Sequence, residues 1–230
     1  MDCQALIFDF DGTILDTETP EFQTWQEIYS GHGFEMPLSY YSDFIGKYNS
    51  SASPFDYLEK QLGHPVERES LKLRFRERIQ EIIATQAVLP GVLDYLTTAR
   101  RLGLRIGLAS SSRSPYLLGH LERLGLLHFF DCVRGADHVT HAKPDPDLYL
   151  SVLADFGLQP DQAIALEDSP NGVLAARRAG LFCVAIPNSI TGQLSLDHAS
   201  LRLNSLADLP LETLLANLKE NRYAALESQG

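Results

Sequence analysis

Four apolar runs of this 230-residue chain are each followed by a polar cluster, and this pattern constrains the fold most strongly. The clusters are Asp9-Phe10-Asp11-Gly12-Thr13, Ser110-Ser111-Ser112, Lys143-Pro144 and Glu167-Asp168. Open parallel α/β sheets place their ligand sites at the carboxyl ends of their strands. Four unrelated turns would not be expected to carry four polar clusters whose chemistry is complementary. The pattern therefore predicts a parallel sheet that brings the four clusters together at one edge.

The first cluster follows the apolar run Leu6-Ile7-Phe8 and holds two carboxylates two positions apart. Residues i and i+2 of an extended segment point the same way, so the side chains of Asp9 and Asp11 can face one cavity. Two neighbouring negative charges are unfavourable unless a cation joins them or one carboxylate takes a proton. On its own, the segment is also typical of a turn before Gly12. With the other clusters, it indicates a hard cation, acid–base chemistry, or both.

From about residue 88 onward, strand-like and helix-like segments alternate. This alternation predicts a parallel sheet with right-handed crossover helices. An N-cap residue, a proline in the first turn and a terminating glycine predict three helices, which start at Ser114-Pro115, Asp145-Pro146 and Ser169-Pro170 and end near Gly125, Gly157 and Gly180. The last strand is expected at Phe182 to Ile186, and the tail beyond about Ala224 is expected to fray.

The segment between Asp16 and about Gln86 has a different texture, with helical patterns and few strand-like runs. Helices are predicted at Glu21 to Tyr29, near Pro54 to Leu62, and at about Val66 to Ala84. The fold class is therefore predicted as α/β, with a Rossmann-like parallel sheet core and an inserted all-helical domain. Residues 1–16 and 87–230 would form the core, and residues 17–86 the insertion.

Composition and charge exclude several classes of partner. The chain is 44% hydrophobic, which is typical of a globular protein, and its formal net charge is −11. Because nucleic acids and anionic membranes need clustered Lys and Arg, neither is an expected partner. Three distant cysteines, Cys3, Cys132 and Cys183, predict no disulfide framework or zinc site, and a reducing cytoplasm fits them. We see no secretory signal or transmembrane segment in the sequence.

The order and spacing of the four clusters resemble those of the haloacid dehalogenase-like superfamily of phosphohydrolases and phosphotransferases. The resemblance runs from about Ala5 to about Ser189. It is strongest to the branch that contains beta-phosphoglucomutase and small sugar-phosphate phosphatases. It implies that the helical insertion is a mobile cap over the active site, with hinges near Leu15 to Thr17 and Gln86 to Pro90.

The resemblance also implies a role for each cluster. Asp9 would be the nucleophile that forms an aspartyl phosphate, and Asp11 the general acid and base. Phosphate would be held by the side chains of Thr13, Ser110 and Lys143 and by the backbone N–H of Ser111. Ser112 and Ser114 are interpreted as structural residues of the loop.

A magnesium ion is the expected cofactor, because a carboxylate that attacks a phosphate dianion needs a cation in contact with both. Mg²⁺ prefers oxygen ligands and typically uses one or two carboxylates together with substrate phosphate. By resemblance, Asp9, Asp168 and the backbone carbonyl of Asp11 would bind it. Glu167 would bind the metal directly or act through a water molecule.

The leading functional interpretation is a Mg²⁺-dependent phosphatase that acts on a small phosphorylated metabolite, such as a sugar phosphate. Three alternatives remain: a phosphomutase of the beta-phosphoglucomutase type, a dehalogenase, and a non-catalytic binding module. Dehalogenases lack the second aspartate, so Asp11 disfavours that branch, and the complete set of catalytic positions disfavours a binding module. The oligomeric state does not follow from the sequence, although a monomer is compatible with it.

Cap residues bear on the choice between phosphatase and mutase. Gly46-Lys47 matches a cap loop that contacts substrate in relatives, so Lys47 is a predicted specificity residue. In the beta-phosphoglucomutase pattern, a histidine lies five residues beyond the aspartate that follows the DxDG motif, and an arginine lies three residues beyond the cap glycine. This chain has Glu21 and Asn49 at those places. Both differences weaken the binding of a second phosphate and favour water as the acceptor. Lys47 or an arginine of the long helix, such as Arg74 or Arg76, is an alternative ligand for that phosphate, which keeps the mutase open.

Overall fold

The computed structural model describes residues 1–41, 45 and 53–220. Its centre is a six-stranded sheet in the order β3-β2-β1-β4-β5-β6, and all neighbouring strands are parallel. The strands are β1 (Ala5–Phe8), β2 (Arg105–Ala109), β3 (Cys132–Arg134), β4 (Ala163–Glu167), β5 (Phe182–Ala185) and β6 (Leu201–Arg202). The parallel α/β sheet was predicted and is confirmed. The two-residue β6 was not predicted, because so short a strand leaves no apolar run in the sequence.

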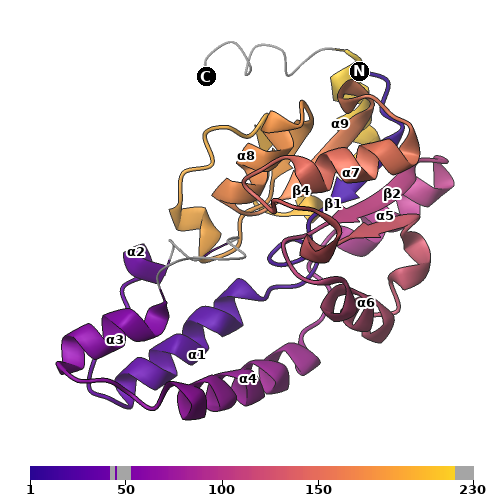
Figure 1. Cartoon of the computed structure of the whole chain (residues 1–230). Coiled ribbons are helices and arrows are strands. Elements are labelled where there is room, and N and C mark those ends of the chain that lie inside the picture. The colour runs from indigo at the N-terminus through magenta and orange to yellow at the C-terminus, as the bar shows by residue number, and fades with distance from the viewer. Residues whose placement is uncertain (42–44, 46–52, 221–230) are drawn as a thin grey trace.

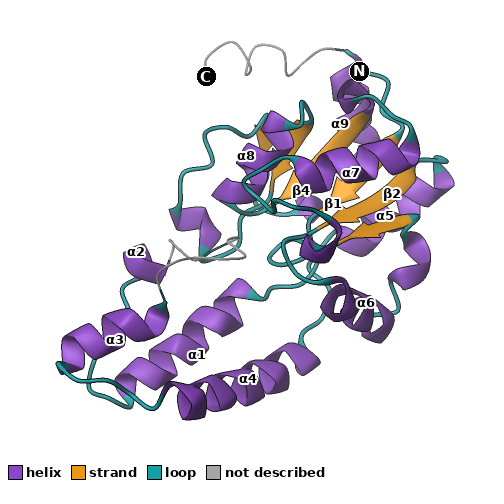
Figure 2. Ribbon diagram, in the orientation of Figure 1, coloured by secondary structure: helices purple, strands orange, loops and turns teal. Residues whose placement is uncertain are grey.

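Helices cover both faces of the sheet, as Figure 2 shows for its orange strands between purple helices. They are α5 (Val92–Arg101), α6 (Ser114–Arg123), α7 (Asp147–Phe156), α8 (Pro170–Arg178) and α9 (Leu211–Lys219). Leu6 and Phe8 of β1 pack in one hydrophobic cluster with α5, α6 and α9, whereas Ala5 and Ile7 pack in another with α7 and α8. Successive side chains of a strand point to opposite faces, so a strand buried on both faces is apolar throughout.

Two of the three predicted N-caps differ from the structure. Helix α6 already includes Ser114, and its hydroxyl lies 2.9 Å from Oδ1 of Asp137 on a neighbouring turn. Helix α7 begins at Asp147 with Pro146 as its N-cap, so the Asp145 cap was wrong. The Ser169 cap is confirmed, since its side chain accepts a hydrogen bond from the N–H of Gly172.

Between β1 and α5 the chain forms the helices α1 (Glu18–Ser30), α2 (Leu38–Tyr41), α3 (Pro54–Leu62) and α4 (Arg68–Thr85). They lie together below the sheet in Figure 1, and α1 runs alongside α4. Their apolar residues form a cluster of their own around Trp25, Tyr29 and Leu58. Ile190, from the segment after β5, packs into this cluster, so the core contacts the insertion here.

Short 3₁₀ turns complete the described part of the fold, at Leu127–Phe129, Ala136–His138, Pro160–Gln162, Thr191–Gln193 and Leu206–Asp208. Within residues 1–41, 45 and 53–220, no helix combines the length and the apolar character needed to cross a membrane. The predicted fraying of the tail beyond Ala224 lies outside the described residues.

Candidate active site

The sheet register places three of the four polar clusters side by side. Phe8, the last residue of β1, pairs with Leu108 of β2 and Leu166 of β4. Asp9, Ser110 and Asp168 therefore emerge from adjacent strand ends. Lys143, from the loop before α7, completes the group. A cavity of about 460 Å³ opens here, lined on the core side by Asp9, Asp11, Ser110, Ser111, Ser112, Arg113, Tyr116, Lys143, Asp168 and Ser169.

Asp9 is 5% exposed and forms an ion pair with the ammonium group of Lys143, which is also buried. Burial raises the pKa of Asp9 well above its usual range; Lys143 opposes this shift, while the negative charges of Glu167 and Asp11 add to it. Burial alone would lower the pKa of Lys143, but the carboxylates of Asp9 and Glu167 outweigh it and raise the pKa. Lys143 is thus held as a cation against Asp9.

Glu167, which is fully buried, has both carboxylate oxygens engaged. Oε1 lies 2.5 Å from Nζ of Lys143 and 2.7 Å from the hydroxyl of Tyr149. Oε2 accepts a hydrogen bond of 3.1 Å from the N–H of Asp168. A Cβ on Gly172 would lie 1.9 Å from Oε1, so the first turn of α8 closes around this carboxylate. The structure therefore makes Glu167 a fixed partner of Lys143.

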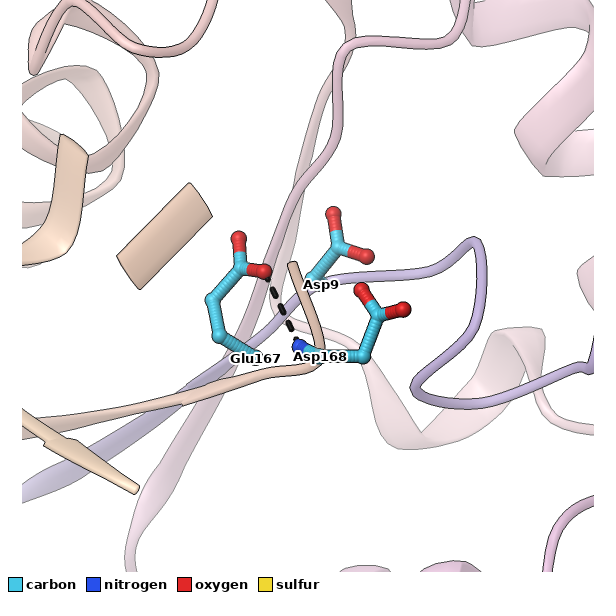
Figure 3. A group of neighbouring side chains, drawn as sticks. All are labelled: Asp9, Glu167 and Asp168. Carbon is cyan, nitrogen blue, oxygen red and sulfur yellow. Dashed lines mark hydrogen bonds between the residues drawn. The ribbon is translucent and has the colours of Figure 1, made fainter. Parts of the chain in front are cut away.

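The carboxylates of Asp9, Glu167 and Asp168 form an acidic group whose candidate ligand atoms lie within 4.8 Å of one another. Figure 3 shows the three side chains, with the hydrogen bond from Asp168 to Glu167 as a dashed line. Asp168 is 1% exposed, and burial, followed by the charges of Glu18 and Asp9, raises its pKa well above its usual range. These three buried carboxylates carry more negative charge than the single ammonium group of Lys143 can balance. Their oxygen atoms are ligands that fit a hard cation such as Mg²⁺.

Glu18, the first residue of α1, adds a further carboxylate that the sequence interpretation missed. A Cβ on Gly12, whose φ is +81°, would lie 2.2 Å from Oδ2 of Asp168 and 2.6 Å from Oε2 of Glu18. Nδ2 of Asn188 lies 3.1 Å from Oδ2 of Asp168 and 3.5 Å from Oε2 of Glu18. Only a glycine fits between these two carboxylates in this backbone conformation. No spacing rule connects the distant residues Glu18, Asp168 and Asn188.

Asp11 is half-buried and accepts hydrogen bonds from three hydroxyl groups. Its Oδ2 lies 2.6 Å from Oγ of Ser112 and 3.3 Å from Oγ of Ser110, and its Oδ1 lies 3.3 Å from the hydroxyl of Tyr116. Ser112, interpreted as a structural loop residue, thus contacts Asp11. Ser112 could have been predicted as a site residue, because it lies two residues after Ser110 in the same cluster. No sequence pattern indicated that Tyr116 on α6 would contact Asp11.

Two buried hydroxyl groups at this edge have no hydrogen-bond partner among the described residues, namely Oγ1 of Thr13 and Oγ of Ser111. Buried hydroxyl groups are normally paired, because an unpaired one loses its hydrogen bonds to water without replacement. Both residues are predicted phosphate contacts. Their free hydrogen-bonding capacity is what an anion with several oxygen acceptors would satisfy.

The insertion forms the opposite wall of the cavity. Its lining residues are Thr17, Glu18, Glu21, Tyr41, Ile45, Phe75, Ile79 and Ile83. Nδ2 of Asn171 donates a hydrogen bond of 2.8 Å to the backbone oxygen of Ile45, which links α8 to this wall. Lys47, the predicted specificity residue, lies outside the described residues.

Known proteins resemble this chain over most of its length. The family model of the haloacid dehalogenase-like hydrolases matches residues 6–186. "Putative phosphatase YhcW" of Bacillus subtilis is 45% identical over 94% of this chain and 97% of its own. "Fructose-1-phosphate phosphatase YqaB" of Escherichia coli is 32% identical over 79% of this chain and 95% of its own. A solved structure of a CbbY variant from Rhodobacter sphaeroides, in complex with xylulose-(1,5)bisphosphate, has a TM-score of 0.67 at 27% identity and covers 90% of this chain and 96% of that one.

The family match spans more than half of the chain, and the relatives are covered almost completely. The predicted resemblance and the predicted phosphoric monoester hydrolase class are both confirmed. A solved structure of a "putative beta-phosphoglucomutase" from Thermotoga maritima has a TM-score of 0.72 at 27% identity and covers 94% of this chain and 99% of that one. The chain therefore belongs to the haloacid dehalogenase-like hydrolase family, in its branch of sugar-phosphate phosphatases and phosphoglucomutase-like proteins.

Proposed function

We propose that this phosphatase hydrolyses the monoester of a small phosphorylated, sugar-like metabolite, with Asp9 as nucleophile and Mg²⁺ as cofactor. The observation that carries the proposal is the buried ion pair of Asp9 and Lys143 at the floor of a cavity that Asp11 and Asp168 also line. The names of the relatives, which include a fructose-1-phosphate phosphatase, support a sugar phosphate as substrate.

In the first step, a carboxylate oxygen of Asp9 attacks phosphorus, and the bond from phosphorus to the ester oxygen breaks. Asp11 gives its proton to the departing alkoxide, which leaves as an alcohol. In the second step, Asp11 takes a proton from water, the water oxygen attacks phosphorus, and the bond to Asp9 breaks. The covalent intermediate divides one difficult displacement into two easier ones.

The hydrogen bonds to Asp11 serve this double role. Ser112 and Tyr116 contact different oxygens of its carboxylate, so its orientation is fixed from two sides. A general acid must lie within hydrogen-bond reach of the atom that it protonates. The two hydroxyl groups therefore position Asp11 toward the cavity.

Asp9, Asp168 and the backbone carbonyl of Asp11 would hold the Mg²⁺ ion. When bound, the ion supplies positive charge that offsets the repulsion between the Asp9 carboxylate and the substrate phosphate. Glu167 would act on the site through Lys143 and the N–H of Asp168, its contacts in this structure.

The phosphate oxygens would be bound by the hydroxyl groups of Thr13 and Ser110, by the backbone N–H of Ser111 and by Lys143. The unpaired buried hydroxyls of Thr13 and Ser111 support an anion in this position. A compact ammonium such as Lys143 suits a phosphate that also contacts a nucleophile and a metal.

Residues 17–86 would act as a cap whose closure excludes bulk water, with hinges near residues 15–17 and 86–90. The helical cluster around Trp25 and the cavity wall formed by α1 and α4 support this division. Lys47 would belong to its specificity loop. The three cysteines are free thiols, which is compatible with the proposed location in the reducing cytoplasm.

The test is a phosphate-release assay on p-nitrophenyl phosphate and a panel of sugar phosphates, with Mg²⁺ and after exhaustive chelation. We expect release that requires the metal and recovers when Mg²⁺ is restored. Undiminished turnover in the chelated protein would contradict the proposal, as would the absence of release from every monoester.

A further inference from the structure

We propose that Glu21 is a specificity-determining residue of this site. Its carboxylate binds hydrogen-bond donors of an uncharged, hydroxyl-bearing leaving group and disfavours leaving groups with a second negative charge. This inference rests on the proposed function and adds the chemistry of the leaving group. It concerns the wall of the cavity opposite the catalytic aspartates.

Glu21 lies on α1 and lines the same cavity as Asp9 and Asp11. The phosphate site is at the strand ends, and Glu21 is on the insertion, so the leaving group of a bound ester would lie between them. Because both carboxylates line this cavity, the charge of Asp11 also raises the pKa of Glu21. Glu21 is thus placed to contact the part of the substrate that is not phosphate.

Two neutral donors lie close to the Glu21 carboxylate. The indole N–H of Trp25 and the phenol of Tyr41, which lines the cavity with Glu21, both favour its charged form and lower its pKa against the larger effect of burial. Trp25 is itself fixed, because its ring lies 5.1 Å from that of Phe55 and 4.5 Å from that of Phe75. Among the ion pairs of the described residues, none includes Glu21. The carboxylate is therefore oriented without being neutralised by a cation of that part of the chain.

Charge decides which leaving groups fit. Glu18, Glu21 and Asp11 all line the cavity, so a second phosphate or a carboxylate on the leaving group would approach several like charges. Burial, and then Asp11, raises the pKa of Glu21 to about 7, which shows how poorly its negative charge is compensated. Hydroxyl groups of a ligand would supply the missing donors, and a carboxylate can accept from two adjacent hydroxyls at once.

The other side of the same wall is apolar. Phe75, Ile79 and Ile83 recur every four residues along α4, so they lie on one face of the helix and line the cavity together. A sugar ring or an open-chain polyol presents hydroxyl groups along its edge and C–H groups over its face. Glu21 could bind the hydroxyl edge of such a leaving group, while the apolar strip of Phe75, Ile79 and Ile83 contacts its C–H face.

The test compares kcat/KM for two substrates, a hexose monophosphate and p-nitrophenyl phosphate, whose leaving group bears no other hydroxyl. In Glu21→Gln, the ratio of the two values should shift against the sugar phosphate by about tenfold, because the sugar hydroxyls would then donate to a neutral acceptor instead of a charged one. Hydrolysis of xylulose-(1,5)bisphosphate should rise relative to the hexose monophosphate. Glu27→Gln is the matched control, since Glu27 is exposed on the same helix and pairs with Arg78.

Tyr41→Phe removes one donor that orients Glu21 without changing its charge, and it should shift the same ratio in the same direction by a smaller factor. It also keeps the inference testable if Glu21→Gln does not fold. Normal release from p-nitrophenyl phosphate with an unchanged substrate ratio in both variants would overturn the role of Glu21 and leave the proposed function intact. Absence of metal-dependent release by the wild-type protein would overturn both.

Discussion

Nζ of Lys143 lies 2.5 Å from Oε1 of Glu167 and also pairs with the carboxylate of Asp9. All three side chains are buried, so the lysine compensates two carboxylates that are largely shielded from water. Removing one member of a buried group leaves an uncompensated charge, which costs more than the intact pair contributes. Stability therefore depends on Lys143, and under the proposed function catalysis does as well.

We expect Lys143→Met to abolish phosphate release and to lower the free energy of unfolding by about 3 kcal/mol or more at neutral pH. Urea unfolding followed by circular dichroism measures the second effect. Lys72→Met is the control, since Lys72 pairs with Glu69 on the exposed surface of α4 and should change neither quantity appreciably. A stable, active Lys143→Met protein would contradict both roles.

Asp9→Asn should remove activity while the melting temperature changes little. The substitution deletes the nucleophile but keeps the size of the side chain, and Lys143 retains Glu167 as a partner. Thermal unfolding and a phosphate-release assay on the same preparation separate the two effects. Turnover close to that of the wild type would show that Asp9 is not the nucleophile.

Mg²⁺ should raise the melting temperature of the wild-type protein, because an ion that binds only the folded state stabilises it by mass action. The effect should be large here, since the ion would offset repulsion between buried carboxylates. In Asp168→Asn the Mg²⁺-dependent increase should be mostly lost, whereas Asp161→Asn, at an exposed position, should retain it. Equal increases in all three proteins would place the bound ion elsewhere.

The sequence predicted those parts of the site that follow from the parallel sheet. Asp9, Ser110 and Asp168 could be placed together because each follows an apolar strand, and parallel strands end at one edge. The helix predicted near Pro54 to Leu62 is also found, as α3, with a proline in its first turn and Gly63 as its C-cap. Both predictions depend on patterns within short stretches of sequence, such as an apolar run followed by a polar cluster.

Contacts between distant segments could not be predicted in the same way. Glu18 and Asn188 are 170 positions apart, yet both approach Asp168. Tyr116 contacts Asp11 only because α6 packs beside the loop after β1. The predicted N-caps of α6 and α7 were wrong for a related reason: Ser114 bonds to Asp137, so tertiary contact overrides the local capping preference.

The stability of the metal-free protein should depend on pH through Glu21. Its pKa rises from the ordinary value of 4.5 to about 7 on folding, mainly through burial. Between these pH values the folded protein binds a proton that the unfolded chain has released, so stability falls as pH rises through this window. The difference in melting temperature between the wild type and Glu21→Gln should therefore favour the wild type more at pH 5.5 than at pH 8. Burial also raises the pKa values of Asp9, Glu18 and Asp168, which act in the same direction, and it lowers the pKa of His120, which acts in the opposite direction. These groups are present in both proteins, so the comparison isolates Glu21.

The choice between hydrolase and mutase depends on whether the cap can bind a second phosphate. A mutase must hold a bisphosphorylated intermediate with one phosphate at Asp9 and the other at cationic cap residues, and it must suppress attack by water. The described cap wall presents Glu18, Glu21 and Tyr41 instead, beside the apolar strip of α4.

We therefore expect water to be the acceptor. Incubation with beta-glucose 1-phosphate and a catalytic amount of the glucose bisphosphate should release inorganic phosphate and free glucose, or leave the sugar phosphate unchanged. Chromatography of the products distinguishes these results from isomerisation. Efficient formation of glucose 6-phosphate with little free phosphate would contradict the hydrolase assignment, because it would require the acidic wall to tolerate a second phosphate next to Glu21.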